Sequence, residues 1–178
     1  MPLYFAYGAN MDIADMAKRA PNSRPLGPAR LPRHRFIIMK EGYASVVRDP
    51  RRSVHGLLWD LALADLRPLD KFEGIDRGLY TKINQPVVVE GGAKRALVYV
   101  ASSAEPGRPK PGYLEGIVAA ARALGFPAAY IAELDRWIAG GVMKNAEKPA
   151  GPVAGVRPTR TSPLDARERA KPEWNWEG

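Results

Sequence analysis

The sequence contains no cysteine and only two histidines, His34 and His55, among its 178 residues. The missing thiols exclude disulfide bonds, thiolate nucleophiles and cysteine-ligated zinc. With only two histidines, we also do not expect a histidine-rich metal site. No stretch approaches the roughly 20 apolar residues of a membrane helix, and the N-terminus lacks the charged-then-apolar pattern of a signal peptide. We therefore expect a cytoplasmic enzyme or binding protein without a membrane partner.

Positive charge is in excess, because 27 lysines and arginines against 19 aspartates and glutamates give a formal net charge of +8. Such an excess can indicate a nucleic-acid partner. The clustered arginines fall beside a predicted strand, in a predicted loop and late in the chain: Arg30, Arg33, Arg35, Arg48, Arg51, Arg52, Arg157 and Arg160. No predicted helix carries a basic stripe, so we do not expect nucleic acid to bind. A basic protein that binds nucleic acid through these clusters stays an alternative.

Short apolar runs separated by glycine and proline predict many strands, with the clearest helices late in the chain. The predicted strands are 3–7, 34–40, 44–50, 53–61, 80–91 and 94–102, and the predicted helices are 11–18, 62–74, 112–125 and 127–141. Residues 21–32, "PNSRPLGPARLP", predict a proline-rich connection, and Pro50 is expected to end its strand. Gly56 indicates a bulge or a close backbone approach, and Gly91-Gly92 a hairpin turn. This order of elements predicts an α+β fold.

The composition changes from residue 140 onward. Residues 140–178 have no apolar periodicity and are rich in proline, glycine and charge, which predicts an extended C-terminal tail. We therefore expect one domain over residues 1–139, followed by this tail. Trp174 and Trp176 are unusual in such a segment and suggest docking onto the body or a neighbouring chain.

The stretch "LDKFEGIDRGLY", residues 69–80, contains the acid that stands out by its context, Glu73. Leu63, Leu66, Leu69 and Phe72 recur every three residues and predict an apolar helix face that leads up to it. A carboxylate at a helix end, beside a glycine that allows close approach, is a candidate general base. The alternative is a solvated acid in a turn; Asp70 and Asp76 have no better claim to the role.

The stretch "LYFAYGANM", residues 3–11, is an apolar run that ends abruptly in Gly8-Ala9-Asn10. A loop there can present several backbone N–H groups in one direction and so bind an anion. Asn10 can add its amide or stabilise the turn. The segment is neither a P-loop nor a dinucleotide fingerprint, because the required lysine and glycine spacing are absent. A plain turn after a strand is the alternative.

Together, "LYFAYGAN", "VHGLLWDL", "LDKFEGIDRGLYTK" and "LVYVAS" resemble, in this order, the gamma-glutamylcyclotransferase family, including the related AIG2-like proteins. That family typically has a Tyr-Gly-Ser-Asn loop, a Gly-x-x-(Trp/Tyr) strand and a Leu-Asp-x-x-Glu-Gly element followed by Gly-x-Tyr. The resemblance continues into "KPGYLEGIVAAARALGFPAAYIAEL" and covers about residues 3–138. It implies a small mixed β-barrel flanked by helices.

The resemblance implies an intramolecular reaction on a small γ-glutamyl substrate. The α-amine attacks the γ-carbonyl and closes a five-membered ring, which releases 5-oxoproline and an amine. Glu73 would be the general base, and partial burial would raise its pKa from about 4.3 toward 6 or 7. No cofactor is required. The leaving group stays open: an amino acid, an alkylamine such as a lysine side chain, or a modified metabolite.

The resemblance also implies which residues contact the substrate. These are the N-terminal segment and several pocket residues: Tyr4, Phe5, Ala6, Tyr7, Gly8, Ala9, Asn10, Tyr80, Tyr99, Ala101 and Tyr113. Ala9 stands where the family most often has serine, so a hydroxyl is missing while backbone binding is kept. This departure leaves open a non-catalytic protein of the same fold that binds a small anion or metabolite.

Overall fold

The computed structural model of the protein describes residues 2–140. The elements follow the chain as β1 (Leu3–Ala6), η1 (Ala9–Met11), α1 (Ile13–Arg19), β2 (Arg24–Ile38), β3 (Ala44–Asp60), α2 (Leu63–Glu73), β4 (Tyr80–Val89), β5 (Gly92–Ala101), α3 (Tyr113–Ala123) and α4 (Ala128–Ile138). The predicted tail lies almost wholly outside the described residues, as do Trp174 and Trp176, so the division at residue 139 stays a prediction. None of the helices within residues 2–140 could span a membrane.

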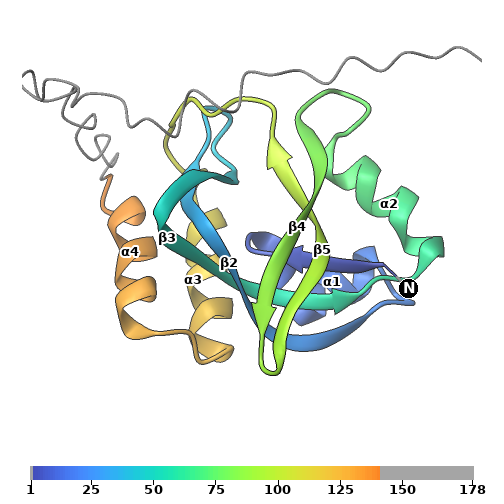
Figure 1. The fold of residues 1–178 in the computed structure, drawn as a ribbon. Helices are drawn as coiled ribbons and strands as arrows, with labels where there is room; N and C mark the ends of the chain where they lie inside the picture. Colours follow the sequence, from blue (N-terminus) through green and yellow to red (C-terminus); the bar gives the residue numbers. More distant parts are fainter. Residues whose placement is uncertain (1, 141–178) are drawn as a thin grey trace, which may run out of the picture. The chain divides into compact units, whose positions relative to one another are not determined.

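The five strands form a closed barrel in the order β1-β3-β2-β4-β5 (Figure 1). β1 runs parallel to β5, with Tyr4 opposite Leu97, while the other neighbours are antiparallel. The barrel is therefore mixed. The helices α3 and α4 pack side by side on one flank, away from α2. The predicted fold, an α+β protein built on a small mixed barrel with flanking helices, is confirmed.

The long β2–β3 hairpin corrects two predictions made from proline. The proline-rich segment 21–32 is mostly strand, and β3 runs through Pro50 without a break. The pairing of β2 with β3 is irregular at two places. The register shifts between Pro25 and Gly27, and it shifts again between Pro32 and His34. At the second step, residues 49–52 have no partner in the register, so the missing N–H of Pro50 leaves no ladder hydrogen bond unmade. Arg48, Arg51 and Arg52, predicted in a loop, therefore lie in β3.

Gly56 in β3 marks a close approach between two strands, as the sequence predicted. A Cβ atom there would lie 2.3 Å from the carbonyl oxygen of Ala6 and 2.6 Å from Cζ of Phe5. Neither distance is compatible with a side chain. β1 can therefore pair closely with β3 and carry its C-terminal end to the pocket.

The helix α2 spans Leu63–Glu73, as predicted, although Pro68 lies inside it. Its predicted apolar face is wrong at both ends, because Leu63 and Phe72 are 71% and 47% exposed while Leu69 is fully buried. The turn per residue is about 100°, so steps of three residues drift by about 60° each. Leu63 and Phe72 consequently fall on either side of the buried stripe. Gly74 ends the helix in the left-handed conformation, with φ +68°.

The remaining elements agree with the predictions except in detail. β4 and β5 form the hairpin expected around Gly91-Gly92, both with positive φ. α3 ends before Gly125, which also has positive φ. The predicted helix 11–18 is a short 3-10 turn, η1, followed by α1, and the side chain of Asp12 caps α1 by accepting the N–H of Asp15. The 3-10 turn sets the conformation of the Gly8–Asn10 segment.

Candidate active site

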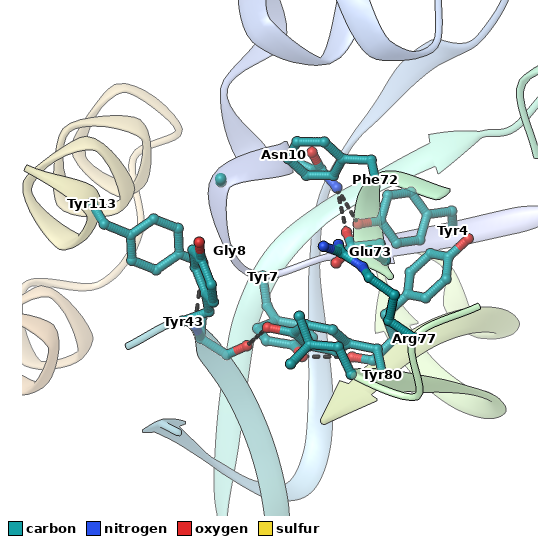
Figure 2. Close-up of a pocket in the computed structure, with 14 residues that line it drawn as sticks. Tyr4, Tyr7, Gly8, Asn10, Tyr43, Phe72, Glu73, Arg77, Tyr80 and Tyr113 are labelled. Atoms are coloured by element: carbon teal, nitrogen blue, oxygen red, sulfur yellow. Dashed lines mark hydrogen bonds between the residues drawn. The ribbon is translucent and has the colours of Figure 1, made fainter. Parts of the chain in front are cut away.

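A pocket of about 210 Å³ opens where the end of β1, the 3-10 turn η1, the end of α2 and the start of α3 come together (Figure 2). It is lined by aromatic residues around one carboxylate: Tyr4, Tyr7, Gly8, Ala9, Asn10, Tyr43, Ala44, Phe72, Glu73, Arg77, Leu79, Tyr80, Tyr99 and Tyr113. Most of the residues that the sequence singled out are therefore neighbours here.

Three residues predicted to contact the substrate do not line this pocket. Phe5 and Ala6 are fully buried in the core. Both lie in β1 and pair with β3, Phe5 opposite Leu58 and Ala6 opposite Leu57. The backbone N–H of Ala101 donates to Oγ of Ser45 at 3.0 Å and so braces β5 against β3. The structure places all three behind the pocket wall.

Glu73 is tied to the N-terminal segment by the amide of Asn10. Nδ2 of Asn10 donates to Oε1 of Glu73 at 2.7 Å and to the hydroxyl of Tyr4 at 3.0 Å. Figure 2 shows these two bonds above the middle of the pocket, with Tyr43 and Tyr113 on the opposite side. The glutamate therefore sits at a defined place on the wall, close to the turn that the sequence predicted as a ligand loop.

Arg19 does not line the pocket but contacts the Asn10 side chain from behind. Its Nη1 donates to Oδ1 of Asn10 at 2.9 Å, and its guanidinium lies 4.2 Å from the centre of the Phe72 ring. It also forms an ion pair with Asp15 at 3.6 Å. The sequence analysis missed Arg19, since nothing in its position near the end of a short helix distinguishes it from Lys18.

The surroundings of Glu73 raise its pKa toward neutral pH. Burial raises the pKa of Glu73 to about 7, against the lowering effects of the Arg19 charge and the Asn10 hydrogen bond; the negative charge of Asp70 adds to the rise. Burial also raises the pKa of Tyr113 to about 12 and holds those of Tyr4 and Tyr7 well above the usual value. The tyrosines stay neutral hydroxyls, whereas Glu73 can gain and lose a proton near pH 7.

Three of the pocket tyrosines donate their protons to the protein itself. Tyr7 donates to the carbonyl oxygen of Tyr99 at 2.5 Å, and Tyr80 donates to that of Ala44 at 2.6 Å. Tyr99 donates to Oδ1 of Asp70 at 2.6 Å. These hydroxyls brace the wall, so their protons are not free for a ligand.

The hydroxyls of Tyr4 and Tyr113 are arranged differently, since they accept hydrogen bonds. Tyr4 accepts from Asn10, and Tyr113 accepts the backbone N–H of Ala44 at 3.1 Å. Neither hydroxyl has a hydrogen-bond acceptor among the described residues, so each can donate its proton into the pocket. The Tyr113 oxygen would lie 3.3 Å from a Cβ atom on Gly8, so a side chain at this position of the turn would crowd the hydroxyl.

The sequence analysis also missed Tyr43, whose place depends on a distant loop. The segment between β5 and α3 crosses the β2–β3 turn, where the N–H of Gly107 donates to Ile38 and that of Lys110 to Gly42. Nζ of Lys110 donates to the Tyr43 hydroxyl at 2.5 Å. The Tyr43 ring meets that of Tyr113 edge-on at 5.4 Å. No local pattern around Tyr43 indicates this contact.

Arg77 lines the pocket on the side of α2 and was also missed. Its guanidinium folds over the preceding turn, where a Cβ on Gly74 would lie 2.9 Å from Nη2. Arg77 forms no ion pair or side-chain hydrogen bond within residues 2–140. No group of three or more histidine, aspartate or glutamate side chains in that range is placed to hold a metal ion.

The comparisons with known proteins agree with one another. The model of the AIG2-like family matches residues 53–134. The gamma-glutamylcyclotransferase of Homo sapiens is 27% identical over 72% of this chain and 74% of its own, and that of Bos taurus is 28% identical over 75% and 77%. A solved gamma-glutamyl cyclotransferase superposes with a TM-score of 0.70 at 26% identity, covering 75% of this chain and 86% of that one.

Proposed function

We propose that this chain, whose likeness to the gamma-glutamylcyclotransferase and AIG2-like family is confirmed by these matches, cyclises γ-glutamyl compounds to 5-oxoproline. The family match supports a function of this type. The observation that carries the specific reaction is Glu73: a carboxylate with a pKa of about 7, fixed by Asn10 at the wall of an aromatic pocket.

The reaction needs a base that works at neutral pH, because the α-amine of the substrate has a pKa near 8 and is largely protonated. A carboxylate of ordinary acidity would be a weak base, whereas one with a pKa of about 7 is well matched to the amine. Glu73 takes a proton from the α-nitrogen. The freed lone pair forms a bond to the γ-carbonyl carbon and closes the five-membered ring.

The carbonyl oxygen becomes negative as the ring closes and needs hydrogen-bond donors. The hydroxyls of Tyr4 and Tyr113 can donate, and the backbone N–H groups at the start of η1 lie on the same wall. When the tetrahedral intermediate collapses, the bond between the γ-carbon and the leaving nitrogen breaks. The protonated Glu73 then donates its proton to that nitrogen, which returns the carboxylate to its starting state. The ring nitrogen loses its second proton to the released amine or to water, so the products are a neutral lactam and a protonated amine or its equivalent in solution.

The shape of the pocket contributes by holding the chain bent. The cavity of about 210 Å³ has tyrosines on several sides that are themselves fixed by hydrogen bonds to the protein. A rigid enclosure keeps the α-amine and the γ-carbonyl of one molecule in contact, which favours ring closure. Arg77 lies at the same pocket and can contact a negative group on the substrate.

The proposal is tested by measuring 5-oxoproline release from γ-glutamyl amino acids and γ-glutamyl alkylamines by mass spectrometry. Two matched controls are the same compounds with an acetylated α-amine, which removes the nucleophile, and the α-linked isomers, in which the γ-carbon carries a carboxylate and no leaving amine. We expect release from at least one γ-glutamyl class and from neither control. If no class is turned over while the compounds protect the protein against thermal unfolding, it is a binding protein and not an enzyme.

A further inference from the structure

We propose that Arg19 is a positioning residue that fixes the orientation of the Asn10 amide and, through it, the Glu73 carboxylate. The inference rests on the proposed function in giving Glu73 the catalytic role. Arg19 itself does not line the pocket and touches neither Glu73 nor the space for a substrate. Its hydrogen bond therefore reaches Glu73 through the Asn10 amide, in addition to the direct effect of its charge on the pKa of Glu73.

The hydrogen-bonding capacity of each group fixes the orientation of the Asn10 amide. A guanidinium can only donate, so the atom of Asn10 that faces Arg19 must be the amide oxygen. That leaves the amide NH₂ for Glu73 and Tyr4, which are the partners it has. Without Arg19 the amide could turn over and present its oxygen to the carboxylate, where two acceptors would oppose each other. Arg19 thus determines that Asn10 supports the ionised form of Glu73.

Arg19 is itself held in place from two sides. Its guanidinium lies over the Phe72 ring at 4.2 Å, and it is paired with Asp15 at 3.6 Å. It stands in the last turn of α1, where a positive charge is favourable to the helix dipole. Phe72 directly precedes Glu73 in the chain, so the stacking also links α1 to the helix end that carries the carboxylate. The half-exposed Phe72 ring is explained by this contact.

The other groups near Glu73 do not replace Arg19. The titratable and charged neighbours come from every element around the pocket: Arg19, Asp70, Arg77, Tyr4, Tyr7, Tyr80, Tyr99 and Tyr113. The tyrosines are neutral, and Asp70 favours the protonated form of Glu73. The loss of Arg19 therefore favours protonation of Glu73 both by removing a positive charge and by freeing the amide.

The test compares Arg19→Met with Lys18→Met. Lys18 is the neighbouring cation on the same helical turn and also pairs with Asp15, at 2.9 Å, but has no contact with Asn10. We expect Arg19→Met to move the acid limb of the kcat/KM profile up by about one pH unit, as for the loss of one charge-assisted contact. The rate at pH 7 should fall about fivefold, and Lys18→Met should leave the profile in place. Equal profiles for both variants would overturn the proposal.

A second measurement separates the relay from a direct charge effect. The titration of the Glu73 side-chain carboxyl is followed by carbon NMR in Arg19→Met, in Asn10→Ala and in the double variant. The direct effect of the Arg19 charge persists in both backgrounds. If Arg19 also acts through Asn10, its removal shifts the Glu73 titration more in the parent than it does once Asn10 is alanine. Equal shifts in both backgrounds would show direct electrostatics and overturn the relay. This titration does not depend on turnover, so it tests the role of Arg19 even if the protein releases no 5-oxoproline. Failure of the proposed function would appear only in the 5-oxoproline assay.

Discussion

The amide of Asn10 and the carboxylate of Glu73 are joined by a 2.7 Å hydrogen bond, although 63 positions separate them in the chain. One residue lies in the 3-10 turn after β1, and the other ends α2. The bond connects the two segments that stand out in the sequence and makes them parts of one site. Burial raises the pKa of Glu73 to about 7, against the lowering effects of the Arg19 charge and of this hydrogen bond.

The first prediction concerns the pH dependence of turnover. Glu73 must be ionised to accept the proton of the α-amine, so kcat/KM should rise with pH and reach half its plateau at about pH 7. A steady-state pH series on the best γ-glutamyl substrate measures this limb. An acid limb centred near pH 4.5 would mean that Glu73 is not the titrating base.

The second prediction concerns stability. The pKa of Glu73 is higher in the folded protein than its ordinary value of 4.5, so the folded state binds a proton more tightly than the unfolded one. The group therefore costs no stability below about pH 4.5, and its cost grows as pH rises toward 7. Glu73→Gln removes this cost while its amide oxygen can still accept from Asn10. We expect a gain of about 1–3 kcal/mol in the free energy of unfolding at pH 8.

Urea denaturation at pH 5 and at pH 8 measures this gain, which should be much smaller at the lower pH. The matched control is Asp76→Asn, which removes an exposed carboxylate from the turn that follows α2. A gain from Glu73→Gln that is the same at both pH values would contradict the assigned titration.

The third prediction tests the close approach of β1 and β3. Gly56→Ala would place a methyl group 2.3 Å from the carbonyl oxygen of Ala6, so we expect a loss of about 2–4 kcal/mol or failure to fold. Gly116→Ala in α3 is the control, because nothing lies within 4 Å of its Cβ position. That change should stabilise the protein by about 0.5–1 kcal/mol, since alanine favours helix. Similar melting temperatures for the two variants would refute the close contact.

The fourth prediction concerns Tyr113 as a hydrogen-bond donor. Tyr113→Phe removes a hydroxyl that can donate into the pocket, and kcat/KM should fall about 10- to 100-fold. Tyr43→Phe is the control: its ring meets that of Tyr113, but its hydroxyl is bonded to Lys110. Its kcat/KM should change less than about threefold if the hydroxyl of Tyr113 is the one that matters. Equal losses in the two variants would remove Tyr113 from the proposed mechanism.

Much of the fold was predictable because its signals are local. The Gly91-Gly92 hairpin and the helix ends at Gly74 and Gly125 follow from residues that adopt positive φ at low cost. The predictions made from proline were wrong because they, too, used only local signals. A proline interrupts a regular pair of strands, but Pro50 lies where the register of β2 and β3 is already irregular. That irregularity depends on the partner strand and has no signature in the residues around Pro50.

The residues of the candidate site also differ in whether local sequence could predict them. Short motifs indicated two candidates: a carboxylate at a helix end beside a glycine, Glu73, and an apolar strand that ends in Gly8-Ala9-Asn10. The family resemblance then gave both their expected roles. Arg19 and Tyr43 were not predicted, because each is placed by contacts with remote segments: Arg19 by Asn10 and Phe72, and Tyr43 by the loop before α3. No residue pattern next to either position reports these contacts.

The role of Glu73 is tested most directly by measuring 5-oxoproline release by Glu73→Gln beside the parent protein, on the best γ-glutamyl substrate. Circular dichroism and thermal melting establish that the variant is folded. We predict that turnover falls by about 10²- to 10⁴-fold, the contribution expected of a general base. Full turnover by a folded Glu73→Gln variant would contradict the role of Glu73 and the mechanism built on it.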